Sequence, residues 1–379
     1  MNKRTIYFDN SATTPLLPEV KEKIINYLDD YGNPSSLYQI GVDSREAINY
    51  ARSQIADALN VNSDRIIFTS GASESNSMVI KSIYDMLKSQ GNHIITSKIE
   101  HHSILECLHY MEKYHGANVT YLNVDNYGRV DPVDVGKAIT EKTILISIMS
   151  SNNEIGTIQN ISSINNIAKS YGILFHSDAT QSFIKQQLEI KDVDMLSISA
   201  HKIGGPKGVG ALYVKNGIDI PPLITGTQEN GHRGGTENLL GIIGFGEASY
   251  VSNKNMKNWN KYISDLSYHF TNRVLNEIPN CHLNGHPSIR LVNNVNIAFD
   301  GIRGEELLIL LDIFGICVST GSACNSSSGE PSHVLKAIGL SDGEANSSIR
   351  FTFSHENTME EIDFTVDRLK ELVERLRTK

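Results

Sequence analysis

Short apolar runs alternate with stretches in which apolar residues recur at helical spacing, and this alternation continues over most of the chain. It predicts a parallel α/β sheet with helices between its strands. The predicted strands are 65–69, 93–96, 119–122, 144–149, 173–175, 195–198 and 210–214. The predicted helices are 18–31, 43–59, one that follows 70–76, 103–114, 164–171 and 237–250.

A charged stretch at 253–262 interrupts this pattern and marks a predicted domain boundary. With 379 residues, of which 40% are hydrophobic, the chain is long enough for more than one domain. We predict a large domain at 16–255 and a smaller domain formed by 1–15 and 256–379. In the smaller domain we predict strands near 294–299 and 347–353 and helices at 305–314, 331–338 and 359–376.

Lys202 stands at the end of the apolar run 195–198, directly before a glycine-rich turn. A lysine that is held at a strand end and partly desolvated can lose its proton near neutral pH, as a Schiff base with a carbonyl cofactor requires. Taken alone, the segment is also compatible with a surface lysine in a glycine-rich loop. It lacks the order of glycine, lysine and hydroxyl residues that a phosphate-binding loop needs.

Asp178 lies in the segment 175–181, which follows the apolar run 172–174, so we expect it at the carboxyl end of another strand, where open α/β sheets bind ligands. It would then share a crevice with Lys202. A pyridoxal enzyme needs an acid partner for the pyridine nitrogen, because the protonated ring stabilises the substrate carbanion. Pyridoxal 5′-phosphate is therefore the candidate cofactor. The turn 70–76 offers amides and the Ser73 hydroxyl to a phosphate, although a plain helix cap fits these residues equally well.

Composition narrows the remaining classes of protein. The formal net charge of -9 argues against a broad surface for nucleic acid or for an anionic membrane. No apolar run approaches the roughly 20 residues of a membrane helix, and the first residues show no signal-peptide core, so we expect a cytoplasmic protein. The 4 cysteines show no Cys-x-x-Cys spacing, so we predict neither a metal site nor a disulfide framework.

The same residues belong to a longer series of ordered motifs. The series runs Phe8-Asp-Asn-Ser-Ala-Thr-Thr-Pro15, Gly32-Asn-Pro-Ser35, Thr69-Ser-Gly-Ala-Ser-Glu-Ser75, Glu100-His-His102, Ser151-Asn-Asn-Glu-Ile-Gly156, Asp178-Ala-Thr-Gln181, Ser199-Ala-His-Lys202, Arg233-Gly-Gly-Thr-Glu-Asn238, Ser319-Thr-Gly-Ser-Ala-Cys324 and Ser348-Ile-Arg-Phe351. Over nearly its whole length the chain thus resembles the pyridoxal-phosphate-dependent cysteine desulfurases of the NifS/IscS type, in the class V aminotransferase group. The resemblance implies fold type I, with a mainly parallel seven-stranded sheet flanked by helices in the large domain and a smaller α+β carboxyl-terminal domain. It also implies that sulfur is removed from L-cysteine, which leaves L-alanine and an enzyme-bound persulfide.

The resemblance implies a role for each motif residue. Lys202 would form the Schiff base, His101 would stack on the pyridine ring, and Asp178 would pair with the ring nitrogen. The residues near the ring hydroxyl would be Asn153 and Gln181. The phosphate would be held by Ala72, Ser73, Ser199, His201 and, from the second subunit of a homodimer, Thr236. The substrate carboxylate would be bound by Arg350, with Asn33 nearby.

Several of these residues have a plainer interpretation when they are taken singly. His101 is compatible with a packed or exposed histidine, Arg350 with a salt bridge, and Thr236 with a helix cap. We keep His102 outside the site, because adjacent side chains tend to diverge. Only the whole series of motifs favours the functional roles.

Cys324 distinguishes a desulfurase from other enzymes of this fold, since transamination needs no thiol. It lies in the small, polar segment 320–329 and is the implied nucleophile, whereas Cys317 lies in an apolar run. The alternatives are a selenocysteine lyase or an aminotransferase of the same fold, and a non-catalytic relative that only binds. The chain stops at Lys379, without the extended tail by which housekeeping members engage an iron-sulfur scaffold. The sulfur-acceptor protein therefore stays open among iron-sulfur cluster assembly, tRNA thiolation and other thio-cofactor pathways.

Overall fold

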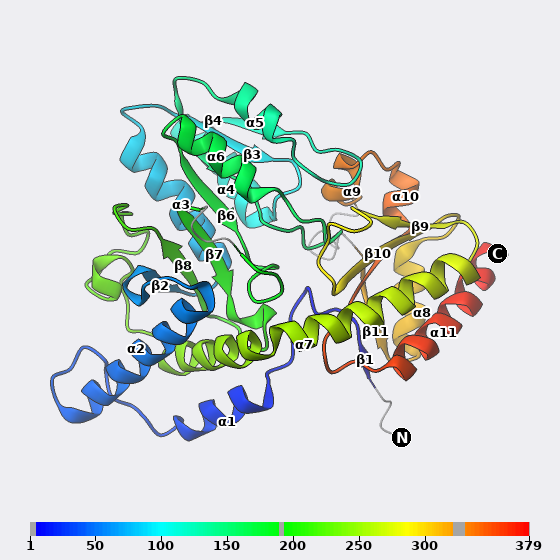
Figure 1. Cartoon of the computed structure of the whole chain (residues 1–379), viewed down its shortest axis with the longest axis horizontal. Helices are drawn as coiled ribbons and strands as arrows, with labels where there is room; N and C mark the ends of the chain where they lie inside the picture. Colours follow the sequence, from blue (N-terminus) through cyan, green and yellow to red (C-terminus); the bar gives the residue numbers. More distant parts are fainter. Residues whose placement is uncertain (1–4, 189–192, 321–329, 379) are drawn as a thin grey trace.

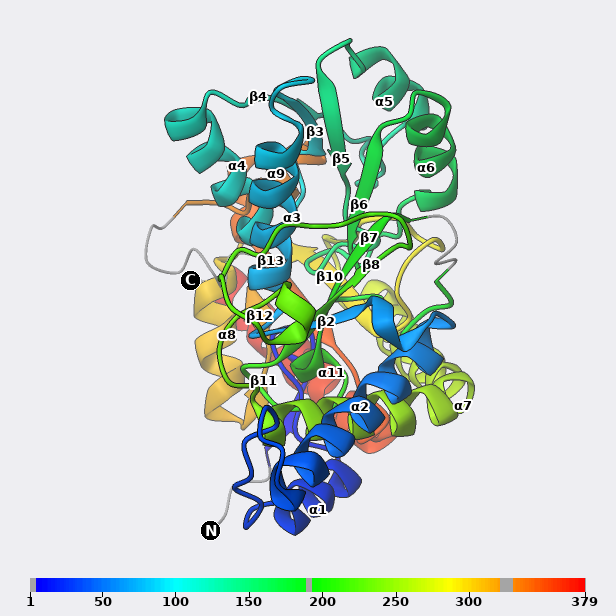
Figure 2. The same cartoon turned by 90° about the vertical axis from the view of Figure 1, so that its left-hand side faces the viewer.

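The computed structural model describes residues 5–188, 193–320 and 330–378, and its central feature is a seven-stranded sheet. The strands lie in the order β2-β8-β7-β6-β5-β3-β4 (Figures 1 and 2). Their bounds are β2 Ile66–Thr69, β3 His93–Ser97, β4 Asn118–Leu122, β5 Thr143–Ser147, β6 Leu174–Asp178, β7 Met195–Ser199 and β8 Gly210–Val214. Within the described chain β8 alone runs antiparallel to its neighbours, so the predicted mainly parallel sheet is confirmed.

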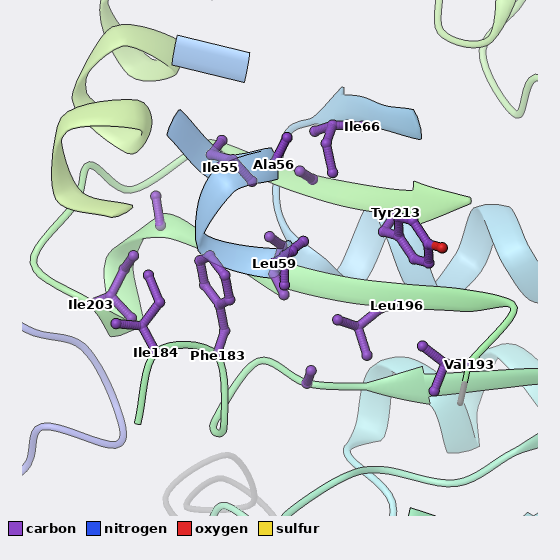
Figure 3. Close-up of a cluster of buried hydrophobic side chains, with 14 of the residues drawn as sticks. Ile55, Ala56, Leu59, Ile66, Phe183, Ile184, Val193, Leu196, Ile203 and Tyr213 are labelled. Atoms are coloured by element: carbon purple, nitrogen blue, oxygen red, sulfur yellow. The ribbon is translucent and has the colours of Figure 1, made fainter. Parts of the chain in front are cut away.

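Helices cover both faces of this sheet, which is why most of its strands are buried along their whole length. These helices are α1 Pro18–Asn26, α2 Gln39–Leu59, α3 Ala72–Leu87, α4 His102–His115, α5 Pro132–Ala138, α6 Ile161–Ser170 and α7 Leu239–Glu277. Successive strand residues point to opposite faces. Ile66 therefore packs with Leu59 of α2, as Figure 3 shows, whereas Ile67 packs in a separate core with Met78 of α3.

A second unit follows along the chain and has its own core. Its four-stranded antiparallel sheet has the order β12-β13-β10-β9, with β9 Cys281–Asn284, β10 Asn294–Phe299, β12 Ser319–Thr320 and β13 Ser348–Thr352. Its helices are α8 Gly304–Ile313, α9 His333–Ala337, α10 Asp342–Asn346 and α11 Met359–Arg377. Strand β1, Ile6–Tyr7, pairs in parallel with β11, Ile316–Cys317, and so places the beginning of the chain beside this unit.

Helix α7 links the two units and differs from the prediction. It runs without a break through 253–262, the stretch predicted as a boundary, and ends only at Glu277. Val251 packs in the core of the large sheet, whereas Leu266 packs in the core of the second unit. The charged residues at 253–262 lie on the exposed side of one long helix, and in the sequence such a stretch resembles a linker between domains. Figure 1 shows α7 passing from one unit to the other. The division into domains at 255 stays a prediction.

Other elements differ from the prediction for local reasons. Helix α1 ends at Asn26, because the apolar residues beyond it, such as Leu28 and Tyr31, find no core and stay exposed. Helix α5 was not predicted, since its seven residues bury only Val135. Within the described residues, no helix is both long and apolar enough to cross a membrane.

Candidate active site

A cavity of about 670 Å³ opens where the chain leaves the carboxyl ends of the parallel strands. Asp178 ends β6 and Ser199 ends β7, and both side chains line this cavity. The predicted site residues that line it are Lys202, His101, Ala72, Ser73, Asn153, Asp178, Gln181, Ser199, His201 and Arg350. The structure thus brings together residues from distant motifs at the end of the sheet where ligands are expected.

Lys202 ends the short 3-10 helix Ala200–Lys202, which directly follows β7. Its amine donates hydrogen bonds to the backbone oxygens of Ser11 and Ala12, at 2.6 and 2.7 Å. The next turn needs glycine, because Gly204 has a φ of +83° and a Cβ there would lie 2.4 Å from Cγ of Leu17. The amino-terminal segment thus closes one side of the cavity and holds the lysine amine.

Asp178 is fixed by two donors. Its Oδ1 accepts from the backbone N–H of Thr180 at 2.9 Å, and its Oδ2 accepts from the side-chain amide of Asn76 at 2.8 Å. The same amide also donates to Oγ of Ser103 at 2.9 Å, and Oγ lies 2.9 Å from Nδ1 of His101. Asn76 therefore joins the two residues that were predicted to act on one ring. Asn76 was not predicted as a site residue, although it ends the phosphate turn 70–76.

His101 is held as a neutral ring. Burial lowers its pKa, and the charges of Lys202 and His102 add to this effect while Asp178 opposes it. The backbone N–H of Ser103 donates to Nδ1 at 3.1 Å, so Nδ1 is an acceptor and the proton of the neutral ring lies on Nε2. His101 can thus donate from one nitrogen while the other is fixed.

The predicted phosphate site lies at the start of α3. Gly71 is the N-cap, and the first backbone N–H groups of a helix have no partner within the helix. The turn is tight, because a Cβ on Gly210 would lie 2.7 Å from the backbone of Gly71. His201 lines the same cavity, and its pKa is lowered to about 4 by burial and by the charges of Lys202 and other lysines. It is therefore a neutral hydrogen-bonding group rather than a cation.

Arg350, on β13, lies on the other side of the cavity and is buried. Its Nη2 lies 2.7 Å from a carboxylate oxygen of Asp9, and its Nη1 donates to the backbone oxygen of Asn153 at 3.2 Å. Asn33 and Thr236 do not line the cavity of this single chain. The structure therefore does not bring Asn33 beside Arg350, and the role of Thr236 across a dimer stays a prediction.

Two histidines that were not expected at the site also line the cavity. His102, which was placed outside it, begins α4, and its ring centroid lies 4.7 Å from that of His333. His333 begins α9, and its Nε2 lies 3.0 Å from the backbone oxygen of Glu100. The expectation for His102 was wrong, because two adjacent side chains at the start of a helix can both face the same cavity. The two adjacent histidines of the Glu100-His-His102 motif were the feature of the sequence that could have indicated His102 as a site residue.

The residues present fit pyridoxal 5′-phosphate. Thr180, Gln181 and Ser151 line the cavity, and each has a buried side-chain oxygen that finds no hydrogen-bond partner within the described chain. Buried polar atoms without a partner are costly, so oxygen atoms of this kind around an open cavity indicate a polar ligand. Asp178 offers a carboxylate to a ring nitrogen, and Lys202 offers an amine to an aldehyde. No group of His, Cys, Asp and Glu side chains in the described residues forms a metal site.

Cys324 lies outside the described residues, so its predicted role stays a prediction. The structure does describe the other three cysteines. Burial raises the pKa of Cys107, of Cys281 and of Cys317, which keeps each of these thiols protonated and unreactive near neutral pH.

Comparisons with known proteins agree with this geometry. The aminotransferase class-V model matches residues 6–364. A cysteine desulfurase IscS of Dictyoglomus turgidum is 50% identical over 99% of this chain and 96% of the relative, and one of Methanosarcina thermophila is 47% identical over 99% and 93%. Among solved structures, a NifS-like protein superposes with a TM-score of 0.92 at 35% identity, covering 98% of this chain and 100% of that one. SspA in complex with cysteine has a TM-score of 0.83 at 36% identity, covering 93% and 100%.

Proposed function

This chain belongs to the aminotransferase class-V family, and from this premise we propose that it is a cysteine desulfurase that converts L-cysteine into L-alanine and an enzyme-bound persulfide. The observation that carries the proposal is the meeting of Lys202, Asp178 and Arg350 in one cavity. These three groups suit an aldehyde cofactor, its ring nitrogen and an amino-acid carboxylate respectively.

Pyridoxal 5′-phosphate is the cofactor of this enzyme class, and when bound it supplies an electron-withdrawing ring next to the α-carbon of the substrate. Lys202 would hold it, Asp178 would pair with its ring nitrogen, and His101 would lie against its ring. The donors for its phosphate would be the amides of Ala72 and Ser73 and the side chains of Ser199 and His201. Gln181 and Asn153 would contact its ring hydroxyl.

Three residues of the chain then act on different parts of the substrate. Arg350 binds the carboxylate through its planar fork, which Asp9 fixes on one side. Lys202 takes the proton from the α-carbon through its amine and later returns a proton to the product. His101, with Nδ1 fixed by Ser103, moves a proton at the substrate sulfur through Nε2.

The sulfur step needs a thiolate, and we assign it to Cys324. Its Sγ attacks the sulfur of the substrate, so an S–S bond forms while the C–S bond breaks. The electron pair of that C–S bond stays with the three-carbon fragment, which takes up protons and leaves as alanine. The enzyme keeps the sulfur as a persulfide and passes it to an acceptor protein. Assignment to Cys324 rests on the motif and on the raised pKa of the other three cysteines, of which Cys107 is buried and Cys281 and Cys317 are partly buried.

We propose a homodimer in which Thr236 of each chain completes the phosphate site of the other. Thr236 is exposed and lies outside the cavity of its own chain. Exposed apolar side chains gather in one stretch of the chain, Ile25, Leu28, Tyr31, Leu37, Tyr38 and Ile40. Apolar surface of this kind on a folded chain marks an interface with another protein.

The proposed function is tested by incubating the purified, cofactor-loaded protein with L-cysteine and no amino acceptor. We expect alanine and bound sulfur in equal amounts from the wild-type protein, and neither from Lys202→Ala. An aminotransferase would form no alanine under these conditions. Turnover of selenocysteine without turnover of cysteine would indicate a selenocysteine lyase instead.

A further inference from the structure

A second cavity, of about 80 Å³, lies behind the amino-terminal segment that closes the active site. Lys202 lines both cavities. The walls of the second are mostly apolar and come from both units, as in Ile203 of the large sheet core and Phe353 of the second core. Its volume is well above the roughly 10–15 Å³ that one water-sized guest needs. The cavity can therefore hold a small ligand where the two units meet.

Lys185 supplies the polar group of this cavity. Its amine is buried and has no hydrogen-bond partner within residues 5–188, 193–320 and 330–378, although the residue as a whole is only partly buried. Burial, followed by the charges of Lys202 and Arg350, lowers the pKa of Lys185 to about 7. An ammonium group without a counter-ion in such a place is costly, and none of the described residues forms an ion pair with it.

The other charged groups around the cavity leave it positive. Lys202 also lines the cavity, but in the cofactor-loaded protein its amine would be held by the cofactor, which leaves Lys185 as the cation of this site. His355 stacks on Trp259 at 3.7 Å, and burial lowers its pKa, so its ring is neutral at neutral pH. The carboxylate of Glu356 belongs to an exposed residue. The lining residues from α7 and from the amino-terminal segment, such as Trp259, carry no charge.

The backbone holds Lys185 in this position by an unusual conformation. Ile184 has a φ of +58°, which is strained for a residue branched at Cβ. Its side chain is buried in the large core, and Figure 3 shows it beside Ile203, the residue after Lys202. Packing of Ile184 thus offsets the strain, and the turn directs the next residue, Lys185, to the cavity wall. Strained backbone of this kind is typical of functional positions.

We propose that this cavity is a binding site for a small monovalent anion, of the size of a halide ion, held by the ammonium group of Lys185. The anion provides the missing counter-ion, and the apolar walls favour a weakly hydrated ion over a strongly hydrated one such as sulfate. The site does not depend on the proposed desulfurase activity. The bound anion would contact both units of the chain, behind the amino-terminal segment that holds Lys202.

Binding of the anion is linked to a proton, because only the charged amine attracts it. Affinity is therefore constant below the pKa of about 7 and falls as the pH rises above it. Between pH 6 and pH 9 the bromide concentration for half-saturation should rise about 100-fold.

Bromide is the probe for this site, and the cofactor-loaded protein is the sample. The variants are Lys185→Met, Lys185→Gln and the control Lys261→Met, which removes an equal charge from an exposed position on α7. Melting temperatures are measured against bromide at constant ionic strength, with sulfate as the balancing salt. At pH 6 we expect the melting temperature of the wild type and of Lys261→Met to rise with bromide to a plateau, relative to both Lys185 variants. At pH 9 we expect this rise to be lost.

Crystals soaked in bromide give a second readout, the anomalous signal of the ion. The expected peak lies in the cavity next to the amine of Lys185 and is absent from Lys185→Gln. Equal melting curves for the wild type and the Lys185 variants, or bromide bound only elsewhere, would overturn the proposal. If cysteine turnover failed while bromide bound as expected, the desulfurase assignment alone would be refuted.

Discussion

Asp9 and Arg350 are 341 positions apart in the chain, and their side chains form a partly buried ion pair of 2.7 Å at the edge of the active-site cavity. The carboxylate contacts Nη2, while Nη1 contacts the backbone oxygen of Asn153. Nε is buried and has no hydrogen-bond partner among the described residues. Asp9 thus fixes the plane of the guanidinium, and a substrate carboxylate must use the remaining face of the fork.

Arg350→Lys should raise KM for cysteine more than about 10-fold, because an ammonium group cannot replace a planar fork that already binds Asp9 and Asn153. Asp9→Asn should have a smaller effect in the same direction, since the arginine keeps its charge and loses only its orientation. Steady-state kinetics with cofactor-saturated protein measure both. An unchanged KM in Arg350→Lys would show that the carboxylate binds elsewhere.

Asp178→Asn should still bind pyridoxal phosphate through Lys202 but should lose more than about 100-fold in kcat, because an amide cannot keep the ring nitrogen protonated. Asn76→Ala removes one of the two donors to Asp178 and should show a weaker loss of the same kind. The visible absorption of the bound cofactor confirms loading, and alanine release gives the rate. Full activity of Asp178→Asn would contradict the role of the carboxylate.

The site residues that could be predicted from the sequence are those at or directly after the end of a strand. Lys202 and Asp178 each follow an apolar run, and parallel strands bring the ends of such runs to one edge of a sheet. The sequence could not predict the Asp9 and Arg350 pair, because no local pattern reports which side chains meet across hundreds of residues. His102 and Asn76 were missed for a related reason, since helix geometry alone does not say which residues of a first turn face a cavity.

The fold shows the same limit. Strands such as β7 were predicted closely because a fully buried strand is a continuous apolar run. Helix α7 was cut short, because its middle packs against two cores on one side while its other side is charged. Short pairings such as β1 with β11 depend on contacts between segments about 310 residues apart in the chain and leave no periodic signal.

A dimer with shared active sites predicts rescue between two inactive variants. A Lys202→Ala chain lacks the amine in its own site, but its Thr236 can complete the phosphate site of its partner. A Thr236→Ala chain keeps the amine in its own site but cannot supply the threonine to its partner. Mixed dimers should therefore contain one complete site and regain part of the activity that both parents lack. Sedimentation checks that dimers form. No gain of activity in verified mixed dimers would show that each site is built from one chain.

Cys324→Ser should bind the cofactor and cysteine but form no persulfide, because a hydroxyl group is a poor nucleophile toward sulfur. Cys317→Ser is the matched control and should transfer sulfur normally, since burial raises the pKa of Cys317 and keeps its thiol protonated. Mass spectrometry after brief exposure to cysteine locates the added sulfur. Finding it on Cys107, Cys281 or Cys317 would refute the assignment to Cys324.

Glu154 should make the protein less stable as the pH rises from about 4.5 to about 7. Burial raises its pKa from 4.5 to about 7, and the contacts with Ser332 and Arg350 only partly oppose this. Between these values the folded protein binds more protons than the unfolded chain, so the free energy of unfolding falls with rising pH. Glu154→Gln should remove this fall and be more stable by at most about 3 kcal/mol above pH 8, with no gain below pH 4.5. Exposed Glu141→Gln should follow the wild-type profile in the same urea titrations, and a constant difference between Glu154→Gln and wild type at every pH would show that Glu154 does not titrate in this range.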